Sequence, residues 1–111
     1  MKARPIREIR LELALVPDPY VMQLLEAVEL NESRANELIA ANSRAWTIDR
    51  LALVDRLIMT LAIGELLMED RPPTAVVLNE AVELARTFST DDSPAFVNGV
   101  LSACAASLFS D

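Results

Sequence analysis

The sequence predicts an all-α protein, a helical bundle of about five helices. The chain has only two glycines among 111 residues, too few for the turns of an all-β fold. Apolar residues recur three and four positions apart over several segments, which is the period of an amphipathic helix. Because 52% of the residues are hydrophobic, the chain can bury one core, and its length suits one domain.

The pattern divides the chain into two parts. Residues 1–18 are predicted to form a basic N-terminal arm, and residues 19–111 the helical domain. Apolar residues alternate with polar or small ones from Ile9 to Leu15, as in a strand, but a helix ended by Pro17 fits equally well. The secondary structure of the arm therefore stays open.

Two short helices are expected next, over residues 19–30 and 33–42. Asp18 is a possible N-cap of the first, with Pro19 at its first helical position, and Ser33 is a possible N-cap of the second. The apolar face of the first helix consists of Val21, Leu24, Leu25 and Val28.

The longest helical pattern follows. Thr47 can cap its start, and Arg71-Pro72-Pro73 should stop it. Residues 74–88 then predict another amphipathic helix. The apolar stripe of the long helix consists of Leu51, Val54, Leu57, Ile58, Leu61, Ala62, Ile63 and Leu66. The inner face of the next helix consists of Val77, Ala81, Leu84 and Phe88.

The last helix, over residues 94–109, has no charged side chain. Asp92 or Ser93 can cap it. Its core face consists of Val97, Val100, Leu101, Cys104 and Leu108, and its opposite face of the small residues Ala95, Gly99, Ser102, Ala103 and Ala106. A helix glycine costs about 1 kcal/mol relative to alanine, so we expect a neighbouring helix of the same chain to cover the small face. A partner docked at Gly99 is the alternative.

Composition excludes several classes of function. The chain has no histidine, which removes the usual general base and the usual metal ligand, and two glycines cannot form a phosphate-binding loop. We therefore expect no enzyme, no catalytic or metal-binding residue, no cofactor and no small-molecule substrate. No apolar run is long enough to span a membrane and no signal peptide is visible. The single cysteine fits a reducing compartment, and we expect a cytoplasmic protein.

The net charge of −7 is unevenly distributed. Residues 1–10 contain Lys2, Arg4, Arg7 and Arg10 against Glu8, a balance of +3, so the other residues hold six basic and sixteen acidic side chains, a balance of −10. A basic arm on an acidic body can contact RNA phosphates. A solvated, frayed terminus is the alternative interpretation.

Three motifs in order resemble the NusB transcription antitermination family. They are Asn79-Glu80-Ala81, Asp92-Ser93-Pro94 and Phe96-Val97-Asn98-Gly99, and the resemblance covers roughly residues 19–109. It implies an all-helical, non-enzymatic protein that binds boxA RNA together with NusE, a protein of the small ribosomal subunit, and supports transcription of ribosomal RNA.

The resemblance also implies roles for individual residues. The basic residues of the arm and the region from Asp92 to Phe96 would bind RNA, whereas Asp49 and Asp55 would face NusE. From the residues alone, a helix cap is the favoured interpretation of Asp92 and a core position that of Phe96, with an RNA contact as the alternative for each. The predicted RNA-binding set is Lys2, Arg4, Arg7, Arg10, Asp92 and Phe96, and the partner-binding set is Asp49, Asp55 and Gly99.

The sequence also departs from the family pattern. The family's first helices are missing from the pattern, Gly64 stands where an aromatic residue is common, and Ser102 stands where an acid is common. An N-terminally truncated or divergent member is expected. The alternative function is a NusB-like module that forms homo-oligomers or binds a protein but has lost RNA binding. A relative of the NusB-like domain found ahead of RNA cytosine methyltransferases ranks last.

Overall fold

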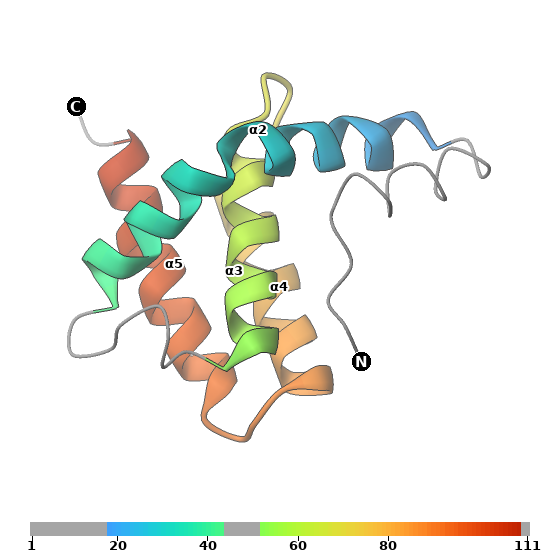
Figure 1. Cartoon of the computed structure of the whole chain (residues 1–111). Helices are drawn as coiled ribbons and strands as arrows, with labels where there is room; N and C mark the ends of the chain where they lie inside the picture. Colours follow the sequence, from blue (N-terminus) through green and yellow to red (C-terminus); the bar gives the residue numbers. More distant parts are fainter. Residues whose placement is uncertain (1–17, 44–51, 110–111) are drawn as a thin grey trace.

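The computed structural model describes residues 18–43 and 52–109, and this part of the chain is all-helical (Figure 1). It contains four helices and no strand: α2 (Pro19–Asn42), α3 (Leu53–Leu66), α4 (Thr74–Phe88) and α5 (Ser93–Phe109). The predicted fold class is confirmed. The predicted count of five is wrong, because four helices are observed. The predicted absence of the family's first helices concerns a region outside the described residues and stays a prediction.

The structure has one helix fewer than predicted because the two short helices expected over residues 19–30 and 33–42 form the single helix α2. The expected break between residues 30 and 33 does not occur, because Asn31 donates its side-chain amide to the Ala27 carbonyl at 2.8 Å within the same helix. No proline or glycine interrupts the segment. Its predicted start is confirmed, since Asp18 Oδ1 accepts hydrogen bonds from the backbone N–H groups of Tyr20 and Val21 at 3.0 and 3.4 Å.

Helix α3 is the centre of the bundle, in contact with α2, α4 and α5 (Figure 1). Its predicted cap, Thr47, lies outside the described residues, and the described helix begins at Leu53. The core contains buried residues from all four helices. They are Ala35 and Ile39 from α2; Ile58, Met59, Ala62, Ile63 and Leu66 from α3; Val77, Ala81 and Ala85 from α4; and Val97, Val100, Leu101, Cys104 and Ala105 from α5.

Helix α2 crosses α3 at Gly64. A Cβ built on Gly64 would lie 2.5 Å from Val28 Cγ2 and 3.1 Å from Val28 Cα. The missing side chain therefore lets the backbone of α2 lie directly against α3. About two turns before Val28 on α2, the Tyr20 hydroxyl donates a hydrogen bond to the carboxylate of Glu65, which follows Gly64 and is itself buried. Burial and this hydrogen bond raise the pKa of Tyr20 to about 12.

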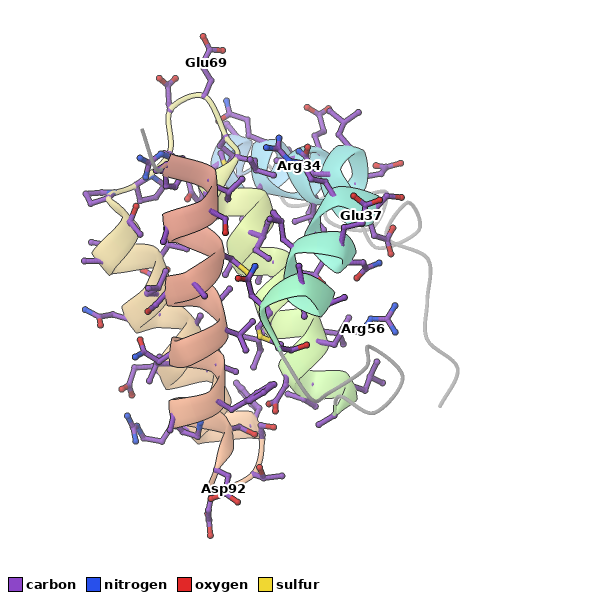
Figure 2. All side chains as sticks on the ribbon, turned by 90° about the vertical axis from the view of Figure 1, so that its left-hand side faces the viewer. Arg34, Glu37, Arg56, Glu69 and Asp92 are labelled. Atoms are coloured by element: carbon purple, nitrogen blue, oxygen red, sulfur yellow. The ribbon has the colours of Figure 1, made fainter. Side chains whose placement is uncertain are left out.

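Helices α4 and α5 form a neighbouring pair on the side of α3 opposite α2 (Figure 2). The Arg71 guanidinium, just before α4, lies 4.0 Å above the ring of Phe109 at the end of α5, a cation–π contact. At the α2 side of α5, Cys104 Sγ donates to the Leu38 carbonyl at 3.6 Å, and burial raises the pKa of this thiol to about 11.

Four described residues predicted to be apolar core are exposed. The exposed fractions are 37% for Val54, 59% for Leu57, 37% for Leu84 and 67% for Phe88. In α4 the buried stripe runs through Val77, Ala81 and Ala85, and Leu84 points about 100° away from Ala85, while Phe88 is the last residue of the helix. The apolar stripe read from the sequence is thus wider than the face that neighbouring helices cover.

Most of the small face of α5 is also exposed, and no helix of the described residues covers it, contrary to the expectation. Ala95, Gly99, Ser102 and Ala106 are exposed, Ala103 is half-buried, and a Cβ on Gly99 would meet no heavy atom within 4 Å. The neighbours of α5 contact the opposite face, where Val97, Val100, Leu101 and Cys104 are buried as predicted. The uncharged small residues of α5 therefore form an open surface.

Candidate nucleic-acid interface

The residues predicted to bind RNA within the described chain lie at the turn from α4 to α5. Helix α4 ends at Phe88, and the Ser89 N–H donates to the Ala85 carbonyl at 2.9 Å. Helix α5 begins after four intervening residues, at Ser93, and the Ser93 N–H donates to the Thr90 carbonyl at 3.1 Å. Hydrogen bonds thus hold both ends of a very short turn.

A buried carboxylate holds this turn to α3. Asp55 Oδ1 accepts a hydrogen bond from Ser89 Oγ at 2.6 Å, and Asp55 Oδ2 accepts one from Ser93 Oγ at 2.9 Å. Asp55 is 6% exposed and Ser93 1%. Ser93 Oγ also accepts from the Thr90 N–H at 3.2 Å and lies 2.8 Å from Thr90 Oγ1. One carboxylate therefore connects α3, the end of α4 and the start of α5.

The two acids of the turn point outward. Asp91 and Asp92 are exposed, and Figure 2 shows Asp92 at the tip of the turn, directed away from the helices. The Phe96 N–H donates to the Asp92 carbonyl at 3.2 Å. The two residues are thus one helical turn apart and share a side of α5. Phe96 is half-buried and packs against the core, which leaves part of its ring accessible.

This arrangement is better suited to bases than to phosphates. Two exposed carboxylates repel phosphate groups, but a carboxylate can accept hydrogen bonds from the exocyclic amino group of a base. A partly accessible aromatic ring offers a surface on which an unpaired base can stack. The turn by itself could read a single-stranded segment, and phosphate contacts would have to come from elsewhere.

Several predicted site residues are not at this turn. Lys2, Arg4, Arg7, Arg10 and Asp49 lie outside the described residues. Asp55 was expected to face a protein partner, but it is buried and both carboxylate oxygens are used within the chain. Gly99 is exposed and lies on α5 about two helical turns after Asp92. The structure thus brings together Asp55, Asp92 and Phe96 at one end of the bundle.

Sequence reasoning named Ser93 only as a possible helix cap and missed the hydrogen bonds of Ser89 and Ser93 to Asp55. The hydroxyl-rich run Ser89-Thr90 with Ser93 is visible in the sequence, and such residues commonly cap helices or bond to nearby backbone. The sequence gives no sign, however, that two of them bond to a carboxylate 34 and 38 residues earlier. Among the described residues, no three acids, cysteines or histidines are grouped so as to hold a metal ion, and no described helix is long and apolar enough to cross a membrane.

Comparison with known proteins decides the family. The NusB family model matches residues 7–106, which is 100 of the 111 residues. The chain belongs to the NusB family. The transcription antitermination protein NusB of Streptomyces avermitilis is 55% identical over 82 residues, and that of Streptomyces coelicolor is 52% identical over 82 residues. The match begins at residue 7, further toward the N-terminus than the motifs that predicted it.

The fold comparison agrees with this assignment. NusB of T. maritima superimposes with a TM-score of 0.73 at 27% sequence identity, covering 94% of this chain and 92% of that one. The two Streptomyces alignments cover 74% of this chain but only 57% and 58% of those NusB proteins. The alignment thus spans less than two thirds of the length of the two Streptomyces proteins.

Proposed function

We propose that the chain is a transcription antitermination factor of the NusB type, which binds boxA-type RNA together with NusE and supports transcription of ribosomal RNA. The observation that carries the proposal is the turn from α4 to α5, where Asp92 and Phe96 lie on one side of α5 above a buried hydrogen-bond network. Relatives named as transcription antitermination proteins match most of this chain.

The proposed mechanism divides the contacts between two regions. Asp92 accepts hydrogen bonds from base amino groups, and the Phe96 ring stacks on a base. Lys2, Arg4, Arg7 and Arg10 provide the contacts to phosphates, which account for most of the salt-sensitive affinity. The role is non-enzymatic and needs no cofactor. It belongs in the cytoplasm, where bacterial transcription takes place.

The test is fluorescence anisotropy with a labelled boxA-type RNA, with and without NusE, across a salt series. We expect binding that NusE strengthens and salt weakens. Reversing the charge of Arg4, Arg7 and Arg10 should lower the salt slope by about 2, since each phosphate contact on a single strand contributes about 0.7. Charge reversal at Arg34, which lies on α2 at the end of the molecule opposite Asp92 (Figure 2), is the matched control and should leave the slope unchanged.

The second candidate function is a protein-interaction module that binds a partner or a second copy but no RNA. The exposed, uncharged face of α5 around Gly99 favours it, because an open helix face without charges is suited to contact another protein. Absence of RNA binding at low salt, even with NusE, would reject the first function. Binding of NusE that Gly99→Lys abolishes would then support the second.

A further inference from the structure

We propose that Asp55 is the positioning residue of the RNA-binding turn: its buried carboxylate fixes the start of α5 and thereby sets the direction in which Asp92 and Phe96 face the RNA. This inference rests on the proposed function. It assigns Asp55 a role different from the partner contact that the family resemblance implies, because the side chain is buried and directed into the chain.

The hydrogen bonds give the carboxylate two separate anchors. Each oxygen of Asp55 accepts from a different hydroxyl, one at the end of α4 and one at the first residue of α5. Among the described residues, the two side-chain hydrogen bonds that join the turn to α3 both end on this one side chain. A carboxylate held by two such bonds is fixed in orientation as well as in position.

The turn needs an anchor because of its own sequence. Asp91 and Asp92 place two like charges next to each other at its tip, and both are exposed. Their repulsion favours an open turn. Ser93 opposes this opening from within the fold, since its hydroxyl also accepts the Thr90 N–H. The turn is thus closed by a hydroxyl that Asp55 orients.

The residue that Asp55 anchors lies close in sequence to both proposed RNA-binding residues. Asp92 directly precedes Ser93, and Phe96 lies three residues after it, within the first turn of α5. A change in the position of Ser93 therefore redirects both proposed RNA-binding side chains together. A base stacked on a ring depends on the orientation of that ring, so loosening the turn should weaken RNA binding even when the bundle stays folded.

Two variants loosen the anchor, and one controls for stability. Asp55→Asn keeps the size of the side chain but replaces one acceptor oxygen with an NH₂ group. Ser89→Ala removes one hydroxyl and serves if the first variant does not fold. Thr60→Val is the matched control, because it removes another buried hydroxyl of the same region, which bonds to the Arg56 carbonyl at 2.8 Å and does not contact the turn.

The first measurement contains no RNA. Amide hydrogen exchange of residues 90–93, 95 and 96 should be about tenfold faster in Asp55→Asn and Ser89→Ala than in the unaltered chain, since the lost bond involves a charged group. Exchange of the same amides should be unchanged in Thr60→Val. Equal exchange in all four proteins would overturn the proposal.

The second measurement is a double-mutant cycle of affinity for the labelled boxA-type RNA, with NusE present. Asp55→Asn should weaken binding about tenfold in the unaltered background and have almost no effect in a background that carries both Asp92→Ala and Phe96→Ala, because the anchor acts through these two side chains. Additive effects, or faster exchange with unchanged affinity, would overturn the positioning role. If the unaltered chain binds no RNA, the proposed function fails, and the exchange measurement still decides whether Asp55 orders the turn.

Discussion

Helix α3 carries a buried carboxylate at each end, and the two differ in what they hold. Near the start of α3, Asp55 accepts hydrogen bonds from Ser89 and Ser93, and Ser93 is itself buried. Near its end, Glu65 accepts one from Tyr20, whose side chain is 40% exposed. The first carboxylate fixes a turn between two helices inside the protein, whereas the second holds the exposed start of α2.

The difference shows why equal burial of two acids does not mean equal importance. A hydroxyl that loses its partner at the edge of the protein can turn to water, but a fully buried hydroxyl cannot. The contribution of each acid to the free energy of unfolding therefore depends on how exposed its hydrogen-bond partners are. Four tests can break or sharpen this comparison.

The largest effect is expected from Asp55→Ala. Because it leaves two hydroxyls without their acceptor, one of them almost completely buried, it should lower the free energy of unfolding by about 3 kcal/mol. Glu65→Ala is the comparison, and should cost about 1 kcal/mol, since Tyr20 can be hydrated. Urea unfolding measures both, and equal losses would contradict the comparison.

Gly64→Ala tests whether the Glu65 end of α3 is held by backbone contact rather than by its hydrogen bond. The new methyl group would overlap the side chain and approach the backbone of Val28, and valine has little rotamer freedom to yield. We expect a loss of about 2 kcal/mol in the free energy of unfolding, larger than that for Glu65→Ala. A loss smaller than that for Glu65→Ala would show that α2 can move away at little cost.

Gly99→Ala is the matched opposite of this substitution. The space around Gly99 is open, so the new methyl group meets nothing and the helix gains from the higher helix propensity of alanine. The free energy of unfolding should rise by about 1 kcal/mol, which thermal or urea unfolding can measure. A loss of stability would mean that another chain already covers this face in solution.

The smallest effect is expected at alkaline pH. The pKa of Tyr20 rises from 10.0 in the unfolded chain to about 12 in the folded protein, so the folded state favours the protonated phenol. This contribution is fully present below pH 10 and is lost as the pH rises toward 12. Cys104 acts in the same direction between pH 9 and about 11. In Tyr20→Phe, the fall in stability between pH 10 and 12 should be shallower, whereas an unchanged slope would contradict the assignment.

The sequence predicted the fold well where local pattern decides it. Helical spacing identified the buried face of α5, and the Asp18 cap located the start of α2. It failed at Asn31, where a polar residue that resembles the end of a helix instead bonds back within it. It also failed at Leu84 and Phe88, because periodicity gives the direction of an apolar face but not how much of it a neighbouring helix covers.

The candidate site was only partly predictable. The position of Asp92 and Phe96 at the start of a helix followed from the order of residues and from the family resemblance. The role of Asp55 could not follow, since it depends on hydroxyls that only the packing of α3 against the α4–α5 turn brings within 3 Å. Gly64 was noted as unusual, but its reason, the close crossing of α2, is likewise a contact between distant segments.

The open face of α5 has a consequence for the behaviour of concentrated solutions. The chain carries a net charge of −7, so two molecules repel each other from most directions. The strip through Ala95, Gly99 and Ala106 has no charge of its own. Electrostatic repulsion therefore opposes the approach of a second molecule least when that molecule approaches this strip. Because added salt screens the remaining repulsion, the second virial coefficient should fall as ionic strength rises. Gly99→Glu places a negative charge on the strip, so the coefficient of this variant should be higher than that of the unaltered chain.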